Sequence, residues 1–192
     1  MAHSLELLLD DHSEQAIRDQ WSALTAAGLP SLVTNTSPTN RPHVTLLAAR
    51  RISPSVDAAL VPATQRLPIS AIVGAPIVFG RGERRVLARL VVPSAELLSL
   101  HAQVSRVARD HLAHATGPVS TDGAFEHTTP GAWTPHVTLA RRLTADQLSA
   151  ALSVLDTGGD ATTTGDIAAR FVAMRRWDGD ERVDHVWPGR AC

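Results

Sequence analysis

The chain has 192 residues, of which 44% are hydrophobic and 19% are charged, as is typical of a folded globular protein with a substantial core. Its formal net charge is −1 and its isoelectric point is about 6.7, so no overall positive field draws it to nucleic acid or to an anionic membrane. All eighteen basic residues are arginine, which we attribute to composition bias. Any phosphate binding must therefore depend on individually placed residues.

The cysteine content and the hydropathy pattern exclude further classes. Cys192 is the only cysteine, which excludes an internal disulfide and a cysteine-based zinc site. The N-terminal segment has no basic signal region, and no apolar run reaches the roughly 18 residues that a membrane span requires. We therefore expect a cytoplasmic protein without a membrane partner, and nothing in the sequence implies an obligate protein partner.

Hydrophobic periodicity and turn residues predict the elements in chain order. The prediction is a strand over residues 4–9, a helix over 11–28, a strand over 42–52, a short helix over 53–62, a hairpin of strands 67–79 and 85–92, a helix from 94 to about 113, an irregular segment over 115–134, a strand over 135–143, a helix over 144–155 and a hairpin of strands 167–177 and 182–187. The antiparallel hairpins argue against a doubly wound parallel sheet and favour an α+β fold.

Capping residues predict where three of the helices begin. Asp11 with Glu14 resembles a capping box, and so does Thr144 with Gln147. Ser94 is a candidate N-cap for the long helix that follows it.

The segment 115–134 has no regular pattern. Loops of about twenty residues are often lids or binding loops, and a plain surface loop is equally compatible with this sequence. Phe125, His127 and Trp133 are the residues of this segment that could stack a nucleobase.

One pentapeptide, PHVTL, occurs twice, at residues 42–46 and 135–139. The shorter pattern His-x-Thr is uninformative by itself, because it also occurs at His114 and His127. The pentapeptide, however, falls in predicted strands at matching places in the two halves of the chain. This repeat predicts an internal duplication, and hence a single domain over residues 1–192 built from two pseudo-symmetric lobes.

Each repeat delivers one imidazole and one hydroxyl to the same face of its strand. Residues two apart in a strand point the same way, so His43 lies with Thr45, and His136 lies with Thr138. A neutral imidazole can accept a proton while a protonated one donates, and hydroxyls can donate to the oxygens of a phosphate. A single motif of this kind could be an ordinary strand with locally satisfied polar groups. The duplication favours a phosphodiester site between the lobes.

The two motifs, the segment GAPIVFGRGERRVLARLVV and the extended second motif HVTLAR together resemble the 2H phosphoesterase superfamily, in particular its bacterial 2′-5′ RNA ligase and RNA 2′,3′-cyclic phosphodiesterase branch. The resemblance covers most of the chain. It implies two α+β lobes, with antiparallel sheets lining a central cleft and helices on the outside. It also implies chemistry that needs no metal and no cofactor.

Carried over to this sequence, the resemblance assigns a role to each motif residue. His43 and His136 are the expected catalytic residues, with His43 as the general acid and His136 as the general base. Thr45 and Thr138 are the expected phosphate-binding residues, and Arg141 is an expected substrate-binding residue.

The position of Arg141 leaves two interpretations open. Arg141 lies an odd number of residues from His136 and from Thr138, so a regular strand would turn it to the opposite face as a solvated charge. A β-bulge between them would bring it to the catalytic face.

The expected function is hydrolysis of a cyclic phosphodiester, with an RNA end or a cyclic nucleotide as the substrate. The alternatives are a 2′-5′ RNA ligase that uses the same site and a non-catalytic module that binds RNA or a nucleotide. The sequence contains no HExxH or CxxC motif, which argues against a zinc hydrolase. It contains no Walker loop or GxGxxG motif, which argues against an ATP-driven ligase.

Overall fold

The structure is a computed structural model that describes residues 2–112, 123–157 and 165–190. Its strands are β1 (His3–Leu9), β2 (His43–Ala49), β3 (Ile69–Phe79), β4 (Arg85–Val91), β5 (His136–Leu143), β6 (Ile167–Asp178) and β7 (Val183–Pro188). Its α-helices are α1 (Asp11–Ala26), α2 (Val56–Thr64), α3 (Ala95–Ala108) and α4 (Ala145–Thr157). The predicted order of strands, helices and hairpins is confirmed. None of the helices in the described residues is long and apolar enough to span a membrane.

The seven strands form one hydrogen-bonded sheet in the order β1-β2-β5-β4-β3-β6-β7, with a further pairing of β1 with β6. Every pairing is antiparallel, which confirms the predicted α+β fold class. Strand β6 connects the two halves, because residues 167–171 pair with β3 whereas residues 171–177 pair with β1. The halves also meet where β2 pairs with β5, at Val44 and Val137.

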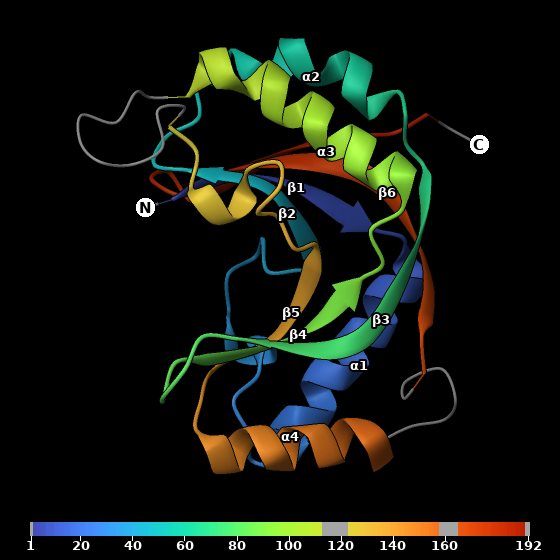
Figure 1. Cartoon of the computed structure of the whole chain (residues 1–192), viewed down its shortest axis with the longest axis vertical. Helices are drawn as coiled ribbons and strands as arrows, with labels where there is room; N and C mark the ends of the chain where they lie inside the picture. Colours follow the sequence, from blue (N-terminus) through green and yellow to red (C-terminus); the bar gives the residue numbers. More distant parts are fainter. Residues whose placement is uncertain (1, 113–122, 158–164, 191–192) are drawn as a thin grey trace.

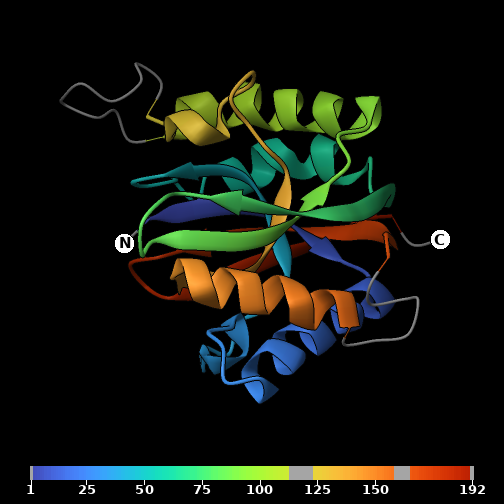
Figure 2. The ribbon, with the colours of Figure 1, turned by 60° about the horizontal axis from the view of Figure 1, so that its bottom comes forward.

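The helices cover the outside of the sheet in two pairs. Helices α2 and α3 pack together on one side, and α1 and α4 pack together on the other (Figure 1). Figure 2 shows the strands as the layer between these pairs. Helix α1 follows β1 in sequence but contacts β5, whereas α3 contacts β2. Each motif strand is therefore supported by a helix on the face opposite to the site.

One cluster of buried apolar side chains runs through both halves. Strand β1 is buried along its whole length, and Leu5, Leu7 and Leu9 are each 0% exposed. The central valines of the two motifs, Val44 and Val137, are also 0% exposed. The core therefore holds both motif strands by their apolar faces, which leaves the faces that carry histidine and threonine directed away from it.

The helix starts agree with two of the three capping predictions. Ser94 accepts a hydrogen bond from Leu97 N at 3.2 Å, and the predicted box of Thr144 and Gln147 forms in both directions. At α1 the prediction is wrong, because the N-cap is Asp10 rather than Asp11.

Several boundaries of the helices differ from the prediction. Helix α2 begins at Val56 and not at residue 53, and α3 ends at Ala108 and not at about residue 113. The Asp10 side chain accepts from Ser13 N at 3.0 Å, so the capping residue of α1 lies one position earlier than expected. Helix α2 continues past Pro62 to Thr64. The segment for which the sequence predicts no regular structure includes a short 3₁₀ helix at residues 126–128, and its residues 115–122 lie outside the described part.

Both motif strands contain a β-bulge at the same position. In β2, Thr45 and Leu47 are opposite successive residues of β1, so Leu46 is the additional residue. In β5, Thr138 and Ala140 are opposite successive residues of β4, so Leu139 is the additional residue. A bulge of this kind reverses the alternation of the residues that follow it. The duplication thus extends from the sequence to the irregularities of the backbone.

Two tryptophans reproduce the same duplication, because each one binds the backbone of one motif threonine. The indole Nε1 of Trp21, on α1, donates to the carbonyl oxygen of Thr138 at 3.0 Å. The indole Nε1 of Trp133 donates to the carbonyl oxygen of Thr45 at 2.8 Å. The backbone carbonyl of each motif threonine is therefore held by an indole from a distant part of the sequence.

Replacing Trp21 with phenylalanine should lower the free energy of unfolding by about 1–3 kcal/mol, because a buried carbonyl loses its donor. Trp21 is 1% exposed, so water cannot readily replace the indole. Urea denaturation followed by circular dichroism measures the change. The control Trp187→Phe alters a side chain that is only partly buried, and should cost clearly less. Equal losses in the two variants would contradict a specific role of the Trp21 hydrogen bond.

Candidate active site

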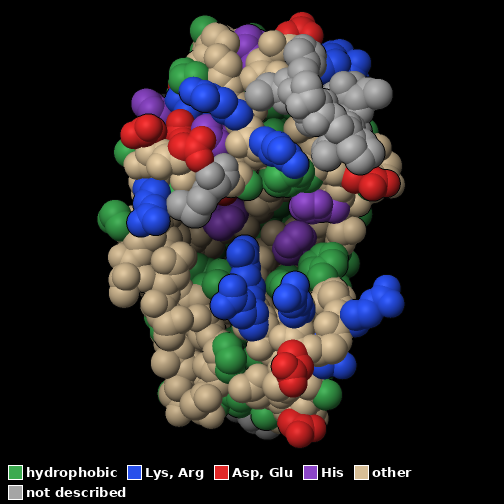
Figure 3. All heavy atoms as spheres, turned by 90° about the vertical axis from the view of Figure 1, so that its left-hand side faces the viewer, with side chains coloured by type: hydrophobic (Ala, Val, Ile, Leu, Met, Phe, Trp, Pro, Cys, Tyr) green, Lys and Arg blue, Asp and Glu red, His purple; other side chains and the backbone are tan. Residues whose placement is uncertain are grey.

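A cleft of about 770 Å³ opens between the two halves of the sheet, and all five predicted site residues line it. They are His43, Thr45, His136, Thr138 and Arg141. Its other walls come from β1, from the end of β6 and from the segment 35–41. Figure 3 shows histidine and arginine side chains gathered around this hollow. The structure therefore brings together residues that lie about ninety positions apart in the sequence.

The pairing of Val44 with Val137 sets the two motifs side by side in opposite directions. In an antiparallel pair of this register, His43 lies beside Thr138 and Thr45 lies beside His136. Both valines point into the core, so the four polar side chains point into the cleft. The arrangement has an approximate twofold axis, and each imidazole has the hydroxyl of the other motif as its neighbour.

Both motif imidazoles are oriented by the same backbone contact. Nδ1 of His43 donates to the carbonyl oxygen of Arg41 at 2.8 Å, and Nδ1 of His136 donates to that of Thr134 at 2.7 Å. A carbonyl oxygen can only accept, so Nδ1 carries a hydrogen in each ring. The neutral form of each histidine therefore has its lone pair on Nε2, which is the nitrogen free to exchange a proton with a ligand.

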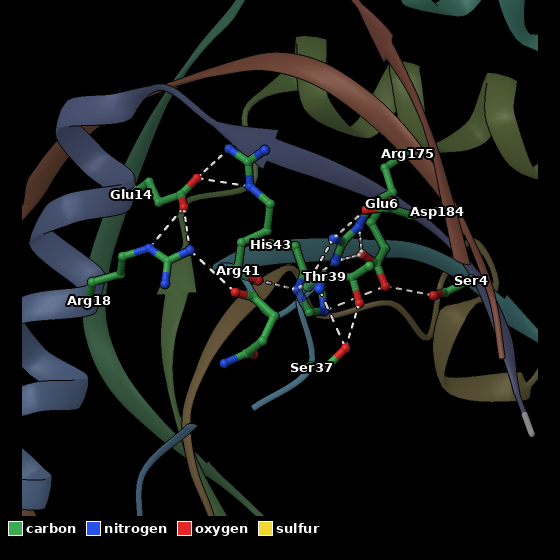
Figure 4. A network of polar contacts seen from close by, with 11 residues as sticks. Ser4, Glu6, Glu14, Arg18, Ser37, Thr39, Arg41, His43, Arg175 and Asp184 are labelled. Carbon is green, nitrogen blue, oxygen red and sulfur yellow. Dashed lines mark hydrogen bonds and ion pairs between the residues drawn. The ribbon is translucent and has the colours of Figure 1, made fainter. Parts of the chain in front are cut away.

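A buried carboxylate lies next to the free nitrogen of His43. Glu6 on β1 has a side chain that is 5% exposed, and its Oε1 is 3.6 Å from His43 Nε2. The same carboxylate accepts from Ser4 Oγ at 2.6 Å and from Arg175 Nε at 2.7 Å. Figure 4 shows Glu6 between His43 and Arg175. The carboxylate of Glu6 therefore places a negative charge beside Nε2 of His43.

Glu6 is ionised despite its burial. Burial by itself raises the pKa of this carboxyl, but the charges of His43 and Arg175 and the hydrogen bonds from Ser4 and Arg175 together lower the pKa below its ordinary value. Arg175 is in turn held by the carbonyl oxygen of Thr39 at 2.8 Å and by Asp184 Oδ2 at 3.2 Å. The guanidinium is thus held on several sides, and it acts as a fixed counter-charge for Glu6.

His136 has the opposite electrostatic surroundings. Burial lowers the pKa of its imidazole, and the positive charges of His43, Arg141 and His127 lower it further, against the raising effect of the hydrogen bond to Thr134. The net result is a pKa below the ordinary value, so the neutral form is favoured near pH 7. The two imidazoles are alike in backbone geometry and differ in charge environment.

The β-bulge at Leu139 decides the orientation of Arg141. Because Leu139 is the additional residue, Arg141 returns to the face of His136 and Thr138, and its side chain lines the cleft. The equivalent position of the first motif is Ala48, which also lines the cleft. At this position, a guanidinium therefore approaches the site from β5 and not from β2.

Sequence reasoning missed several residues of the cleft. Glu6 and Arg175 were not among the predicted site residues. A single carboxylate among the leucines of β1 is a usable signal for Glu6, but Arg175 has none, because β6 also contains Arg170 and Arg176.

Two of the three residues that the sequence offered for stacking a nucleobase, His127 and Trp133, do line the cleft, whereas Phe125 does not. The Trp133 ring is stacked on His101 at a centroid distance of 3.9 Å.

Among the described residues, one group has the composition of a metal site. His3, Asp178 and Asp180 bring three potential ligand atoms within 4.8 Å of one another. His3 Nε2 is 3.4 Å from Asp178 Oδ1 and 3.1 Å from Asp180 Oδ2, so the group already forms ion pairs when the imidazole is protonated. It includes neither of the motif histidines.

Comparison with known proteins identifies the family. Residues 11–181 match the 2′-5′ RNA ligase superfamily, which is most of the chain. The chain belongs to this superfamily. No curated protein sequence is significantly similar to it.

The solved structure of Escherichia coli LigT agrees with this assignment at the level of the fold. Escherichia coli LigT complexed with 3′-AMP is 15% identical, with a TM-score of 0.50, over 97% of this chain and 93% of LigT. Kluyveromyces marxianus Usb1 is 13% identical, with a TM-score of 0.47, over 97% of each chain. Membership of the 2′-5′ RNA ligase superfamily, which is a 2H phosphoesterase family, indicates an enzyme that breaks or joins phosphodiester bonds.

In the free enzyme, His136 should titrate below the ordinary histidine value of about 6.5, because burial and neighbouring positive charge favour its neutral form. Imidazole proton shifts followed by NMR as a function of pH give the midpoint, with His136→Ala used to assign the resonance. The exposed His185 on β7 is the internal reference. A midpoint for His136 above that of His185 would contradict the described environment.

Proposed function

We propose that the protein hydrolyses a cyclic phosphodiester, and that its substrate is a 2′,3′-cyclic phosphate on an RNA end or on a nucleotide. The observation that carries this proposal is the pair of imidazoles in one cleft, each with Nε2 free and each beside the hydroxyl of the other motif. Hydrolysis of a diester needs one proton acceptor, one proton donor and donors for the phosphate oxygens, and this arrangement provides all of them.

In the proposed reaction, Thr45 and Thr138 donate hydrogen bonds to the non-bridging oxygens of the phosphate. Charge builds on these oxygens as phosphorus becomes pentacoordinate, so fixed donors stabilise the transition state more than the ground state. The guanidinium of Arg141 contributes positive charge to the same oxygens from β5. Because the two indoles fix the backbone of both threonines, little reorganisation is needed during the reaction.

The proton transfers follow from the two charge environments. His136, which is neutral near pH 7, accepts a proton from water as the water oxygen bonds to phosphorus. The bond from phosphorus to one ribose oxygen breaks, and protonated His43 donates the proton from Nε2 to that leaving oxygen. Glu6 supports this role because its negative charge lies 3.6 Å from the Nε2 that donates the proton. The products are a phosphomonoester and a free ribose hydroxyl.

Two other functions use the same geometry. Ligation of a 2′,3′-cyclic end is the same type of transfer, with a ribose hydroxyl in the place of water as the nucleophile. A non-catalytic nucleotide-binding module would keep the fold without turnover. Two oriented proton-transfer groups favour an enzyme over a binding module, and E. coli LigT, which shares the fold, has been solved with 3′-AMP.

His43→Ala and His136→Ala should each lower kcat/KM on a 2′,3′-cyclic nucleotide by about 10²–10⁴-fold, the usual contribution of a general acid or base. The control His185→Ala changes an exposed histidine outside the cleft, and activity should be retained. Wild-type activity should also persist in EDTA, since imidazoles and hydroxyls supply every group of the proposed mechanism. Loss in EDTA that a divalent ion restores would contradict the metal-free mechanism.

The assignment of acid and base can be tested by changing the leaving group. A ribose oxygen leaves as a strongly basic alkoxide unless it is protonated, whereas a nitrophenolate departs without a proton. His43→Ala should therefore retain a much larger fraction of wild-type activity on a nitrophenyl diester than on a cyclic phosphate. His136→Ala should lose both activities alike, because water still needs a base.

Glu6→Gln provides a graded version of this test. Glutamine keeps the shape of Glu6 but removes the charge beside His43, so the loss should again be greater on the cyclic phosphate than on the nitrophenyl diester. The opposite pattern in the two histidine variants would exchange their roles, and no dependence on the leaving group in any variant would remove the acid step.

A further inference from the structure

A second hollow adjoins the cleft on the side of the β3–β4 hairpin. It has a volume of about 570 Å³ and is lined by Glu83, Arg84, Val86, Arg141 and Arg142. Arg141 also lines the catalytic cleft, so one guanidinium belongs to the walls of both hollows. A ligand that extends beyond the cleft at Arg141 therefore reaches this second hollow next.

The backbone of β5 presents two consecutive arginines here. A second register shift lies between Arg85 and Val86, where Arg141 is opposite Val86 and Leu143 is opposite Arg85. Arg142 is the additional residue, and its φ is 61°. In a regular strand one of two neighbouring side chains would turn toward the core, but Arg141 and Arg142 are both exposed.

The conformation of Arg142 has a free-energy cost. A φ in the left-handed region is uncommon for residues other than glycine, and it costs an L-residue roughly 1–2 kcal/mol. Backbone outliers of this kind gather at functional sites, where the surrounding structure holds them in place. The bulge thus places a second guanidinium beside Arg141 at a cost that ordinary strand pairing does not require.

Positive charge is concentrated in this corner of the molecule. We define the arginine ridge as Arg84, Arg141 and Arg142, the three arginines that line the hollow. Among the described residues, Glu83 supplies the only carboxylate that lines the hollow beside the ridge, although the whole chain has a net charge of −1. Within the described part of the chain, none of these three guanidiniums forms an ion pair. Figure 3 shows arginine side chains directly beside the hollow that holds the histidines.

We propose that the arginine ridge binds the phosphodiester backbone of an RNA strand whose cyclic phosphate end occupies the cleft. The inference rests on the proposed function and favours one of its two substrates, the RNA end over the single nucleotide. Guanidinium groups match phosphate oxygens in a forked geometry, and they stay charged at every physiological pH. A nucleic-acid strand carries its next negative charge only a few ångströms along from the last, so a phosphate at Arg141 is followed by others along the ridge.

The test compares two substrates in a variant that leaves the catalytic residues intact. Arg84→Gln with Arg142→Gln removes two charges of the ridge and keeps Arg141. Its kcat/KM on an RNA oligonucleotide with a 2′,3′-cyclic end should fall on the order of tenfold, as expected when two exposed arginines no longer bind phosphate. Its kcat/KM on a cyclic mononucleotide should be unchanged, because a mononucleotide does not extend beyond the cleft.

Salt dependence gives a readout that a general loss of folding or activity would not reproduce. The slope of log(kcat/KM) for the oligonucleotide against log[salt] should become shallower by about 0.7 for each phosphate that the variant no longer neutralises. The matched control is Arg50→Gln with Arg51→Gln, which removes two neighbouring exposed arginines that line neither hollow. This control should keep both the activity and the salt slope.

Equilibrium binding separates a failure of this inference from a failure of the proposed function. Fluorescence anisotropy with a labelled, 3′-phosphorylated RNA oligonucleotide needs no turnover. Weaker binding by the ridge variant than by the control supports the ridge even if no cyclic phosphate is hydrolysed. Equal binding by the two variants, or a tenfold loss that is the same for mononucleotide and oligonucleotide, overturns it while leaving the proposed hydrolysis intact. An acidic peptide tests whether the ridge binds carboxylates instead of phosphates. If the ridge variant binds this peptide more weakly than the control does but binds the RNA equally well, the inference is also overturned.

Discussion

The pairing of Val44 with Val137 is the contact on which the geometry of the site depends. It sets β2 in register with β5, and both side chains are 0% exposed. Antiparallel pairing at these central valines makes the motifs run in opposite directions about an approximate twofold axis, with each histidine beside the threonine of the other motif. The apolar core fixes the valines, and the alternation of the strands then directs the polar residues into the cleft.

This symmetric backbone carries asymmetric charge. Both imidazoles donate from Nδ1 to the carbonyl two residues earlier, so their shape and orientation are equivalent. Their neighbours differ, because His43 lies beside the carboxylate of Glu6 whereas His136 packs against the Phe79 ring at a centroid distance of 4.6 Å. The two motifs therefore place one imidazole beside a negative charge and the other beside an aromatic ring. The proposed acid and base roles depend on this difference, and residues outside the repeats create it.

Much of the fold could be predicted from the sequence, because its local signals agree with the tertiary structure. The order of strands and helices, the hairpins and the capping box of Thr144 with Gln147 depend on residues close together in the chain. The boundary error at Asp10 has a local cause, because adjacent aspartates compete for one capping position. The error at Pro62 does not, because α2 continues past this proline while it packs against α3. The closure of the sheet through β6 depends on pairings across the whole chain, which no local pattern encodes.

For the site, the sequence by itself determined which residues form the repeat, because an identical pentapeptide in two strands places His43, Thr45, His136 and Thr138 on equivalent faces. Only the tertiary structure decided the rest. The bulge at Leu139 turns Arg141 into the cleft, and a bulge depends on the partner strand rather than on the bulged residue. The charge of Glu6 reaches His43 because β1 pairs with β2. Electrostatic interactions act through space, so the residues that distinguish the two histidines need not be close to them in sequence.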